Sequence, residues 1–170
     1  MIFPYAASTP KHLWINYLKK WTPVVLWGWC ILFFSTSHFS STNTSQILVP
    51  LLYWLDPNIS AEQIETIHLI IRKLGHWSEY FVFGALTLRA LRNEAIGMWE
   101  RRHLVLALVI LFMYASSDEF HQSFVPSRTA AFGDVMIDLF GGICGSLWMY
   151  VRHGRKSGDQ KPEVTARQVF

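Results

Sequence analysis

Apolar residues gather into four long stretches that are separated by polar segments. The stretches comprise residues 21–39, 77–91, 104–117 and 135–151. Apolar runs of this kind are typical of helices that cross a lipid bilayer, although two of the four are shorter than the roughly 20 residues that a hydrocarbon core requires. The pattern predicts an all-α fold, an integral membrane bundle of four transmembrane helices.

The segment that follows the first span is shorter and interrupted. Residues 47–55 are apolar but contain Pro50, and they are too few to cross a bilayer. We therefore expect an interfacial or re-entrant segment after the first span. Ser60 followed by Gln63 fits a capping box at a helix start, and the isoleucines that follow keep helical spacing. This helix is expected to continue into the second span, with Gly75 as the point where it would bend.

The composition excludes most other classes of protein. Residues of the hydrophobic set make up 51% of the chain and charged residues only 16%, whereas about 25% charged residues are usual in soluble domains. This balance argues against a water-soluble, a disordered or a disulfide-stabilised protein. Cys30 and Cys144 both lie inside apolar runs, where a free cysteine behaves as a small hydrophobic residue.

The distribution of basic residues predicts an orientation in the membrane. If the N-terminus is cytoplasmic, 12 of the 15 Lys and Arg residues fall on the cytoplasmic side, and only Arg72, Lys73 and Arg128 lie outside. Such a bias in short loops is the positive-inside pattern, so both termini are expected in the cytoplasm. The basic excess therefore indicates membrane orientation and no nucleic-acid partner. The predicted divisions are a cytoplasmic N-terminal segment 1–20, a membrane domain 21–151 and a disordered cytoplasmic tail 152–170.

Ionisable residues in the last three spans lie at one predicted depth. At 1.5 Å per residue, they lie about 20–28 Å from the basic residue at the cytoplasmic end of their span. A hydrocarbon core is about 30 Å thick, so these residues lie near its outer surface. Ionisable groups within a membrane are costly unless they pair or face a wet cavity, so we expect them to turn inward. They are predicted to form a polar pocket that opens toward the outside.

Helical spacing supports this inward orientation. Asp134 and Asp138 share one stripe with Gly141 and Gly145, where the glycines allow a close helix contact. The alternative is that the polar groups only join the helices through charge pairs. The residues predicted to line the pocket are Lys73, His76, Glu79, Tyr80, Asp118, Glu119, Gln122, Arg128, Asp134 and Asp138.

The predicted pocket residues could support several kinds of chemistry. His76 and His121 lie on different segments and no HExxH or CxxC motif occurs, so neither a metal site nor a cofactor is predicted. A Ser–His–acid set can be written from the serine-rich segment near Asp118, but proximity in sequence does not orient a triad. Paired carboxylates suit acid–base catalysis and a proton-coupled carrier equally. No catalytic residue is therefore assigned.

Anion recognition explains the polar residues most simply. Lys73, His76 and Arg128 bring positive or protonatable groups to the outer headgroup level, and arginine is well shaped to hold a phosphate or carboxylate. Tyr80 and the neighbouring phenylalanines would supply apolar walls. The predicted partner is an anionic or polar envelope molecule, either a lipid headgroup or a cell-wall precursor.

Three ordered blocks resemble the VanZ-like family of small bacterial membrane proteins. The blocks are KLGHWSEYFVFG at residues 73–84, SDEFHQSFVPSR at 117–128 and DVMID at 134–138, followed by a glycine pair. The run FSTS at 34–37 also resembles the end of the family's first span. This chain departs from the family pattern at Ser127, where glycine is frequent, and at Asp138, where asparagine is frequent.

The resemblance implies a compact multi-pass helical bundle in the bacterial cytoplasmic (inner) membrane. The founding member of the family is associated with low-level resistance to teicoplanin, so a link to glycopeptide resistance or envelope homeostasis is one implication. Two further hypotheses stay open. One is a membrane hydrolase or transferase that acts on a lipid-linked substrate, and the other is a non-catalytic membrane assembly partner. The oligomeric state is not predicted.

Overall fold

The computed structural model describes residues 10–36, 41–91, 101–124 and 131–158, and the regular structure within these ranges is entirely α-helical. The helices are α1 (Pro10–Phe34), α2 (Ser41–Leu55), α3 (Ala61–Leu91), α4 (Arg101–Gln122) and α5 (Phe132–Gly158). The predicted all-α fold is thus confirmed for these residues. Since α5 continues to Gly158, the first residues of the predicted tail are helical, while residues 159–170 lie outside the described ranges.

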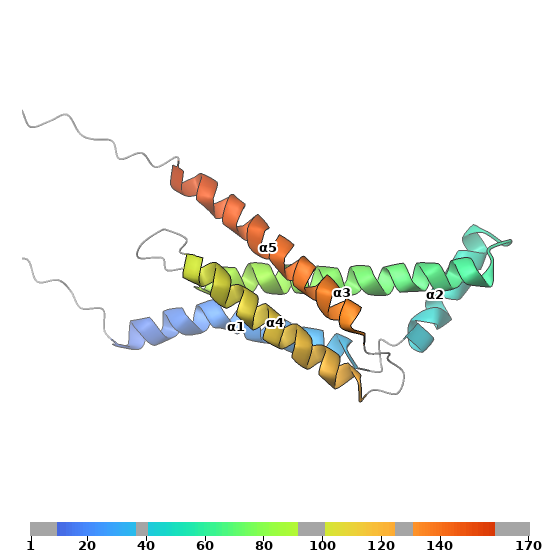
Figure 1. The fold of residues 1–170 in the computed structure, drawn as a ribbon, viewed down its shortest axis with the longest axis horizontal. Helices are drawn as coiled ribbons and strands as arrows, with labels where there is room; N and C mark the ends of the chain where they lie inside the picture. The colour runs from blue at the N-terminus through green and yellow to red at the C-terminus, as the bar shows by residue number, and fades with distance from the viewer. Residues whose placement is uncertain (1–9, 37–40, 92–100, 125–130, 159–170) are drawn as a thin grey trace, which may run out of the picture.

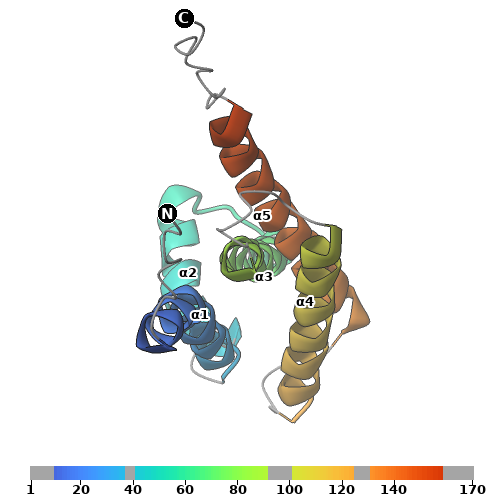
Figure 2. The same cartoon turned by 90° about the vertical axis from the view of Figure 1, so that its left-hand side faces the viewer.

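The helix α3 is the centre of the bundle. It contacts α1, α2, α4 and α5, and its most extensive contact is with α5. Viewed along the bundle, α1 and α2 lie on one side of α3, and α4 and α5 lie on the other (Figure 2). The four longer helices alternate in direction, because α1 and α4 run one way and α3 and α5 return (Figure 1). Because every other helix contacts α3, the position of a residue along α3 determines which residues of the other helices lie near it.

The surface of α4 and α5 is apolar, whereas several ionisable residues are buried between the helices. Met113 and Phe140 are 64% and 61% exposed, whereas Asp118 and Asp138 are 1% and 0% exposed. In a water-soluble protein, the apolar side chains would be buried and the ionisable side chains would be exposed. Within the part of the chain that the structure describes, two helices are long and apolar enough to cross a membrane, Arg102–Gln122 and Phe132–Arg152. These features indicate a membrane protein.

The other two predicted spans lie in α1 and α3, which do not meet the same criterion of length and apolar composition. In α1, the apolar run is preceded by Lys19 and Lys20. In α3, His76 and Glu79 interrupt the apolar sequence. Only two of the four predicted spans are therefore defined by length and composition within the described ranges.

The segment predicted to be interfacial or re-entrant lies in α2. This helix has 15 residues and contains Pro50, so it is shorter than the roughly 20 residues of a spanning helix. It contacts the N-terminal part of α3 (Figure 1). The predicted capping box is confirmed, because the Ser60 N–H donates to Gln63 Oε1 at 2.8 Å and the Gln63 N–H donates to Ser60 Oγ at 3.2 Å.

From this cap, α3 runs through Gly75 without interruption for 31 residues. At 1.5 Å per residue it is about 46 Å long, which exceeds the thickness of a hydrocarbon core. Its first turns extend beyond the bundle and lie against α2 (Figure 1). One part of α3 therefore forms the centre of the bundle, and its first turns lie outside the bundle next to α2.

Glycines bring the backbones of α3 and α5 into contact. A Cβ atom at Gly145 would lie 1.8 Å from the carbonyl oxygen of Phe81, and one at Gly141 would lie 2.3 Å from that of Trp77. Such distances are sterically impossible, so no larger residue fits without separating the helices. The predicted glycine stripe is confirmed, and it holds the aspartates of α5 against α3.

Two hydrogen bonds tie α1 to the bundle. The indole N–H of Trp27 donates to the backbone carbonyl of Glu79 at 2.8 Å, and the hydroxyl of Tyr114 donates to the backbone carbonyl of Gly28 at 2.7 Å. The buried side chains of Ile31, Tyr80 and other core residues pack in the same region. The C-terminal end of α1 is thereby held near α3 and α4.

We predict that Gly145→Ala destabilises the protein by about 1–3 kcal/mol or more, because the added methyl group would force the two backbones apart. For a chain of this size, each kcal/mol lowers the Tm of the detergent-solubilised protein by about 2–4 °C. Gly133→Ala is the matched control on the same helix, because a Cβ at Gly133 meets nothing within 4 Å. Equal Tm values for the two variants would contradict the close contact.

Candidate functional site

Three helices each bring one ionisable side chain to a single buried point. His76 comes from α3, Asp118 from α4 and Asp138 from α5, and all three are buried. One donor atom of each lies within 4.8 Å of the donor atoms of the other two. His76 Nδ1 is 3.1 Å from Asp138 Oδ1. We call these three residues the acidic cluster.

Hydrogen bonds from two neighbouring residues hold Asp118 in place. The hydroxyl of Ser35 donates to Asp118 Oδ1 at 2.5 Å, and the amide of Gln122 donates to Asp118 Oδ2 at 3.1 Å. The same amide lies 3.2 Å from Ser35 Oγ. All three side chains are buried. This network joins the end of α1 to α4, although Ser35 and Asp118 are 83 residues apart.

Asp134 carries its own pair of cations. It lies one helical turn before Asp138 and is 2% exposed. Arg72 Nη2 donates to Asp134 Oδ2 at 2.9 Å, and Lys73 Nζ donates to Asp134 Oδ1 at 3.3 Å. The charge of Asp134 is therefore balanced by two neighbouring residues of α3.

Several buried polar atoms around the acidic cluster lack a hydrogen-bond partner among the described residues. They include Asp138 Oδ2, the Tyr80 hydroxyl and Glu119 Oε2. The other oxygen of Glu119 accepts a hydrogen bond from the backbone N–H of Ala131, just before α5 begins. Glu119 thus links the end of α4 to the start of α5, and unsatisfied oxygens remain in the interior.

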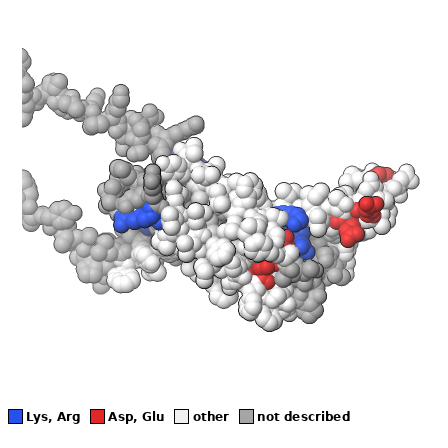
Figure 3. All heavy atoms as spheres, in the orientation of Figure 1, with Lys and Arg blue, Asp and Glu red and all other residues white. Residues whose placement is uncertain are grey.

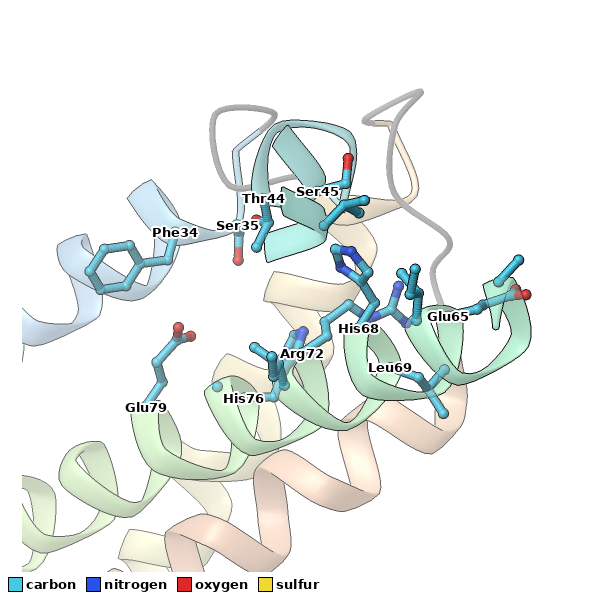
Figure 4. A pocket seen from close by; sticks show the side chains of 15 residues that line it. Phe34, Ser35, Thr44, Ser45, Glu65, His68, Leu69, Arg72, His76 and Glu79 are labelled. Atoms are coloured by element: carbon cyan, nitrogen blue, oxygen red, sulfur yellow. The ribbon is translucent and has the colours of Figure 1, made fainter. Parts of the chain in front are cut away.

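A cavity of about 820 Å³ lies beside the acidic cluster. It is enclosed by the C-terminal end of α1, by α2 and by the N-terminal half of α3. His68, Arg72 and His76 are spaced four residues apart on α3, so they lie along one face of the helix and line the cavity (Figure 4). Apolar residues such as Val49 and Leu69 also line it, together with the acidic Glu65 and Glu79 and several hydroxyl side chains. The cavity therefore combines a basic strip with apolar and polar walls.

Two nitrogens of the basic strip are buried without a hydrogen-bond partner in the described ranges, Arg72 Nε and His68 Nε2. A buried N–H group without a partner is costly, and such groups are commonly satisfied by a ligand or an ordered water. The same residues that line the cavity thus offer unused hydrogen-bonding capacity.

The ten predicted pocket residues fall into several groups. His76 and Glu79 line the cavity. Lys73 and Asp134 pair with each other, and Arg128 lies outside the described residues. The remaining residues are buried or form contacts deeper in the bundle, and they are Tyr80, Asp118, Glu119, Gln122 and Asp138. The predicted single pocket is thus distributed over a cavity, an ion-pair group and a buried cluster.

Sequence reasoning missed three residues of this region, namely Ser35, His68 and Arg72. The spacing of His68, Arg72 and His76 at every fourth position was a signal that they share a helix face. Ser35 had no such signal from periodicity, and only the resemblance of the run at 34–37 pointed to it. Its contact with Asp118 depends on how α1 packs.

An apolar exterior around buried carboxylates is typical of a helical membrane protein. The family model described as VanZ/LLP1 matches residues 20–153, which is most of the chain. The chain therefore belongs to this family, and the resemblance in its three sequence blocks is confirmed. No curated protein and no solved structure matches the chain.

We predict that Ser35→Ala destabilises the folded protein by about 1–3 kcal/mol, because buried Asp118 would lose a hydrogen-bond donor. Ser78→Ala is the control, since the exposed Ser78 hydroxyl only donates to the backbone carbonyl of Gly75 at 2.8 Å. Thermal unfolding in detergent measures both variants. An unchanged Tm for Ser35→Ala would contradict a buried network that depends on this hydroxyl.

Proposed function

We propose that α1, α3, α4 and α5 all cross the bacterial inner membrane, with both termini in the cytoplasm. The alternating directions of these helices support this topology, because successive spans must run in opposite directions (Figure 1). Lys19 and Arg89 lie toward the end where α1 begins and α3 ends. On the visible face of the described residues, the acidic side chains lie toward the other end, where basic side chains are visible as well (Figure 3). Basic residues favour the cytoplasmic side, so the cavity would face outward.

Cysteine labelling in intact cells tests this topology. In a background with Cys30→Ala and Cys144→Ala, we expect a membrane-impermeant maleimide to label Asn58→Cys, which lies in the exposed connection between α2 and α3. Thr165→Cys in the C-terminal segment should react only after permeabilisation. The reverse pattern would place the cavity on the cytoplasmic side and contradict the proposal.

The proposed activity is the binding of an amphipathic envelope molecule with an anionic or polar head, either a lipid or a lipid-linked cell-wall precursor. The observation that carries this proposal is a pair of buried, unpartnered nitrogens, Arg72 Nε and His68 Nε2, in two basic side chains that line the cavity. A volume of about 820 Å³ is typical of small-molecule sites. The cavity therefore suits a head that accepts hydrogen bonds and an apolar chain beside it.

Asp134 supports the same function by orienting Arg72. It accepts a hydrogen bond from Nη2 of the guanidinium at 2.9 Å, while Nε keeps no hydrogen-bond partner among the described residues. Arginine presents several N–H donors in a planar fork, an arrangement that suits phosphate and carboxylate groups. Lys73, held by the same aspartate, adds positive charge nearby. Arg128, predicted from the sequence as a second anion-binding cation, remains part of the proposal.

A second candidate function is hydrolysis or group transfer on a lipid-linked substrate. The observation that favours it is the 3.1 Å contact between His76 Nδ1 and Asp138 Oδ1, because a carboxylate that orients an imidazole is a common acid–base arrangement. His76 also lines the cavity in which the substrate would lie. In either case the protein would act in envelope physiology, and glycopeptide resistance is one phenotype to examine.

We predict that a phosphate-bearing lipid copurifies with the detergent-solubilised protein and that Arg72→Gln weakens its retention about tenfold, since a charge-assisted hydrogen bond is lost. Arg89→Gln is the matched control on the same helix, because Arg89 is exposed and does not line the cavity. Mass spectrometry of the bound lipid measures both variants. Equal retention by both, or no bound lipid, would contradict the binding proposal.

The same preparation separates binding from catalysis. An enzyme would convert a member of a panel of lipid-linked substrates, and His76→Gln would abolish that conversion. Lipid retention without turnover across the panel would favour the binding function.

A further inference from the structure

The acidic cluster has the donor types and the compactness of a metal site. We propose that His76, Asp118 and Asp138 together bind one divalent first-row transition-metal ion, such as Zn²⁺ or Mn²⁺. This inference is independent of the lipid proposed above. It rests on the geometry, the charge balance and the unsatisfied atoms of the cluster.

The geometry is close to that of a coordinated ion. Bonds from Zn²⁺ to nitrogen and oxygen are about 2.1 Å long, so two donors of a tetrahedral site lie about 3.4 Å apart. In the acidic cluster, donor atoms from all three residues lie within 4.8 Å of one another. Side-chain shifts of up to about 1 Å would therefore bring all three into coordination. Since each residue comes from a different helix, the ion would join α3, α4 and α5.

The charge balance of the interior favours a cation. Asp118 and Asp138 are fully buried, and each carries a negative charge when ionised. The basic side chains of Arg72 and Lys73 are engaged by Asp134, one helical turn away from Asp138. Two buried carboxylates at one point repel each other in a medium of low polarity. One divalent ion would neutralise both.

Unsatisfied atoms at the cluster point independently to a missing ligand. Asp138 and Tyr80 are both 0% exposed, yet Asp138 Oδ2 and the Tyr80 hydroxyl have no hydrogen-bond partner within the described residues. A metal ion would satisfy the carboxylate oxygen. Asp118 is meanwhile held by Ser35 and Gln122, and hydrogen bonds of this kind orient the ligands of metal sites.

The donor set and the access route define the class of ion. Imidazole and carboxylate ligands suit Zn²⁺, Mn²⁺ and Fe²⁺, whereas Mg²⁺ and Ca²⁺ prefer oxygen ligands alone. Ser35 and His76 also line the cavity, so an ion can reach the cluster from there. Three protein ligands would leave a coordination position for water or for an oxygen of a molecule in the cavity.

Metal reconstitution tests the proposal on the full-length protein, purified through a tag that contains no histidine. After removal of metal with EDTA, the protein is loaded with Zn²⁺ or Mn²⁺, and bound metal per chain and Tm are measured. We expect about one ion per chain and a higher Tm, with Mg²⁺ and Ca²⁺ not retained. His76→Gln and Asp138→Asn should bind the ion at least about tenfold more weakly, and Ser35→Ala about 10–100-fold more weakly.

Asp134→Asn is the matched control, because it changes a buried aspartate of the same helix that lies outside the acidic cluster and should keep the metal. A Co²⁺ absorption band that His76→Gln abolishes would support the site directly. Absence of bound metal in folded protein would overturn the proposal, as would equal metal binding by Asp138→Asn and Asp134→Asn. Failure of metal binding would leave the lipid retention of the Arg72 variants unaffected, so the two proposals fail separately.

Discussion

The close backbone contact between α3 and α5 is the constraint on which the rest of the structure depends. Gly84, Gly141 and Gly145 leave no room for a Cβ atom between the two helices. In a membrane, lipid tails are as apolar as leucine, so association of helices relies on close packing more than on the hydrophobic effect. The contact sets the distance from Asp134 and Asp138 to the residues of α3 opposite them. A wider separation would break the ion pairs and the contact with His76 together.

The second constraint is the need to satisfy ionisable groups away from water. Asp134 is paired with two cations, Asp118 accepts two hydrogen bonds and Asp138 contacts His76. These partners come from α3, from α4 and from Ser35 just after α1, so the polar interior also determines how the helices fit together. The compensation is incomplete at Asp138 Oδ2, which is where a bound cation would act. The acidic cluster and the cavity lie next to each other, because His76 belongs to both and Ser35 lines the cavity and contacts Asp118.

The sequence predicted those features that depend on helical periodicity. The capping box at Ser60 and the glycine stripe of α5 follow from spacing within single helices, and both are present. Periodicity within a helix does not determine which helix faces pack against each other. The contact of Ser35 with Asp118, the pairing of Arg72 with Asp134 and the cavity beneath α2 all depend on tertiary packing. The sequence predicted that His76, Asp118 and Asp138 line one pocket but did not predict a metal site, because its three residues come from three helices and form no local motif.

A double-mutant cycle between His76 and Asp138 tests the central claim most directly, because these residues lie 62 positions apart and meet only if α3 and α5 pack as described. Thermal unfolding would be measured for the native protein, His76→Gln, Asp138→Asn and the double variant, all after removal of metal. The account predicts a coupling free energy of about 0.5–3 kcal/mol, as is usual for residues in direct contact. Effects that add within about 0.3–0.5 kcal/mol would contradict it, because such additivity is typical of residues that do not touch.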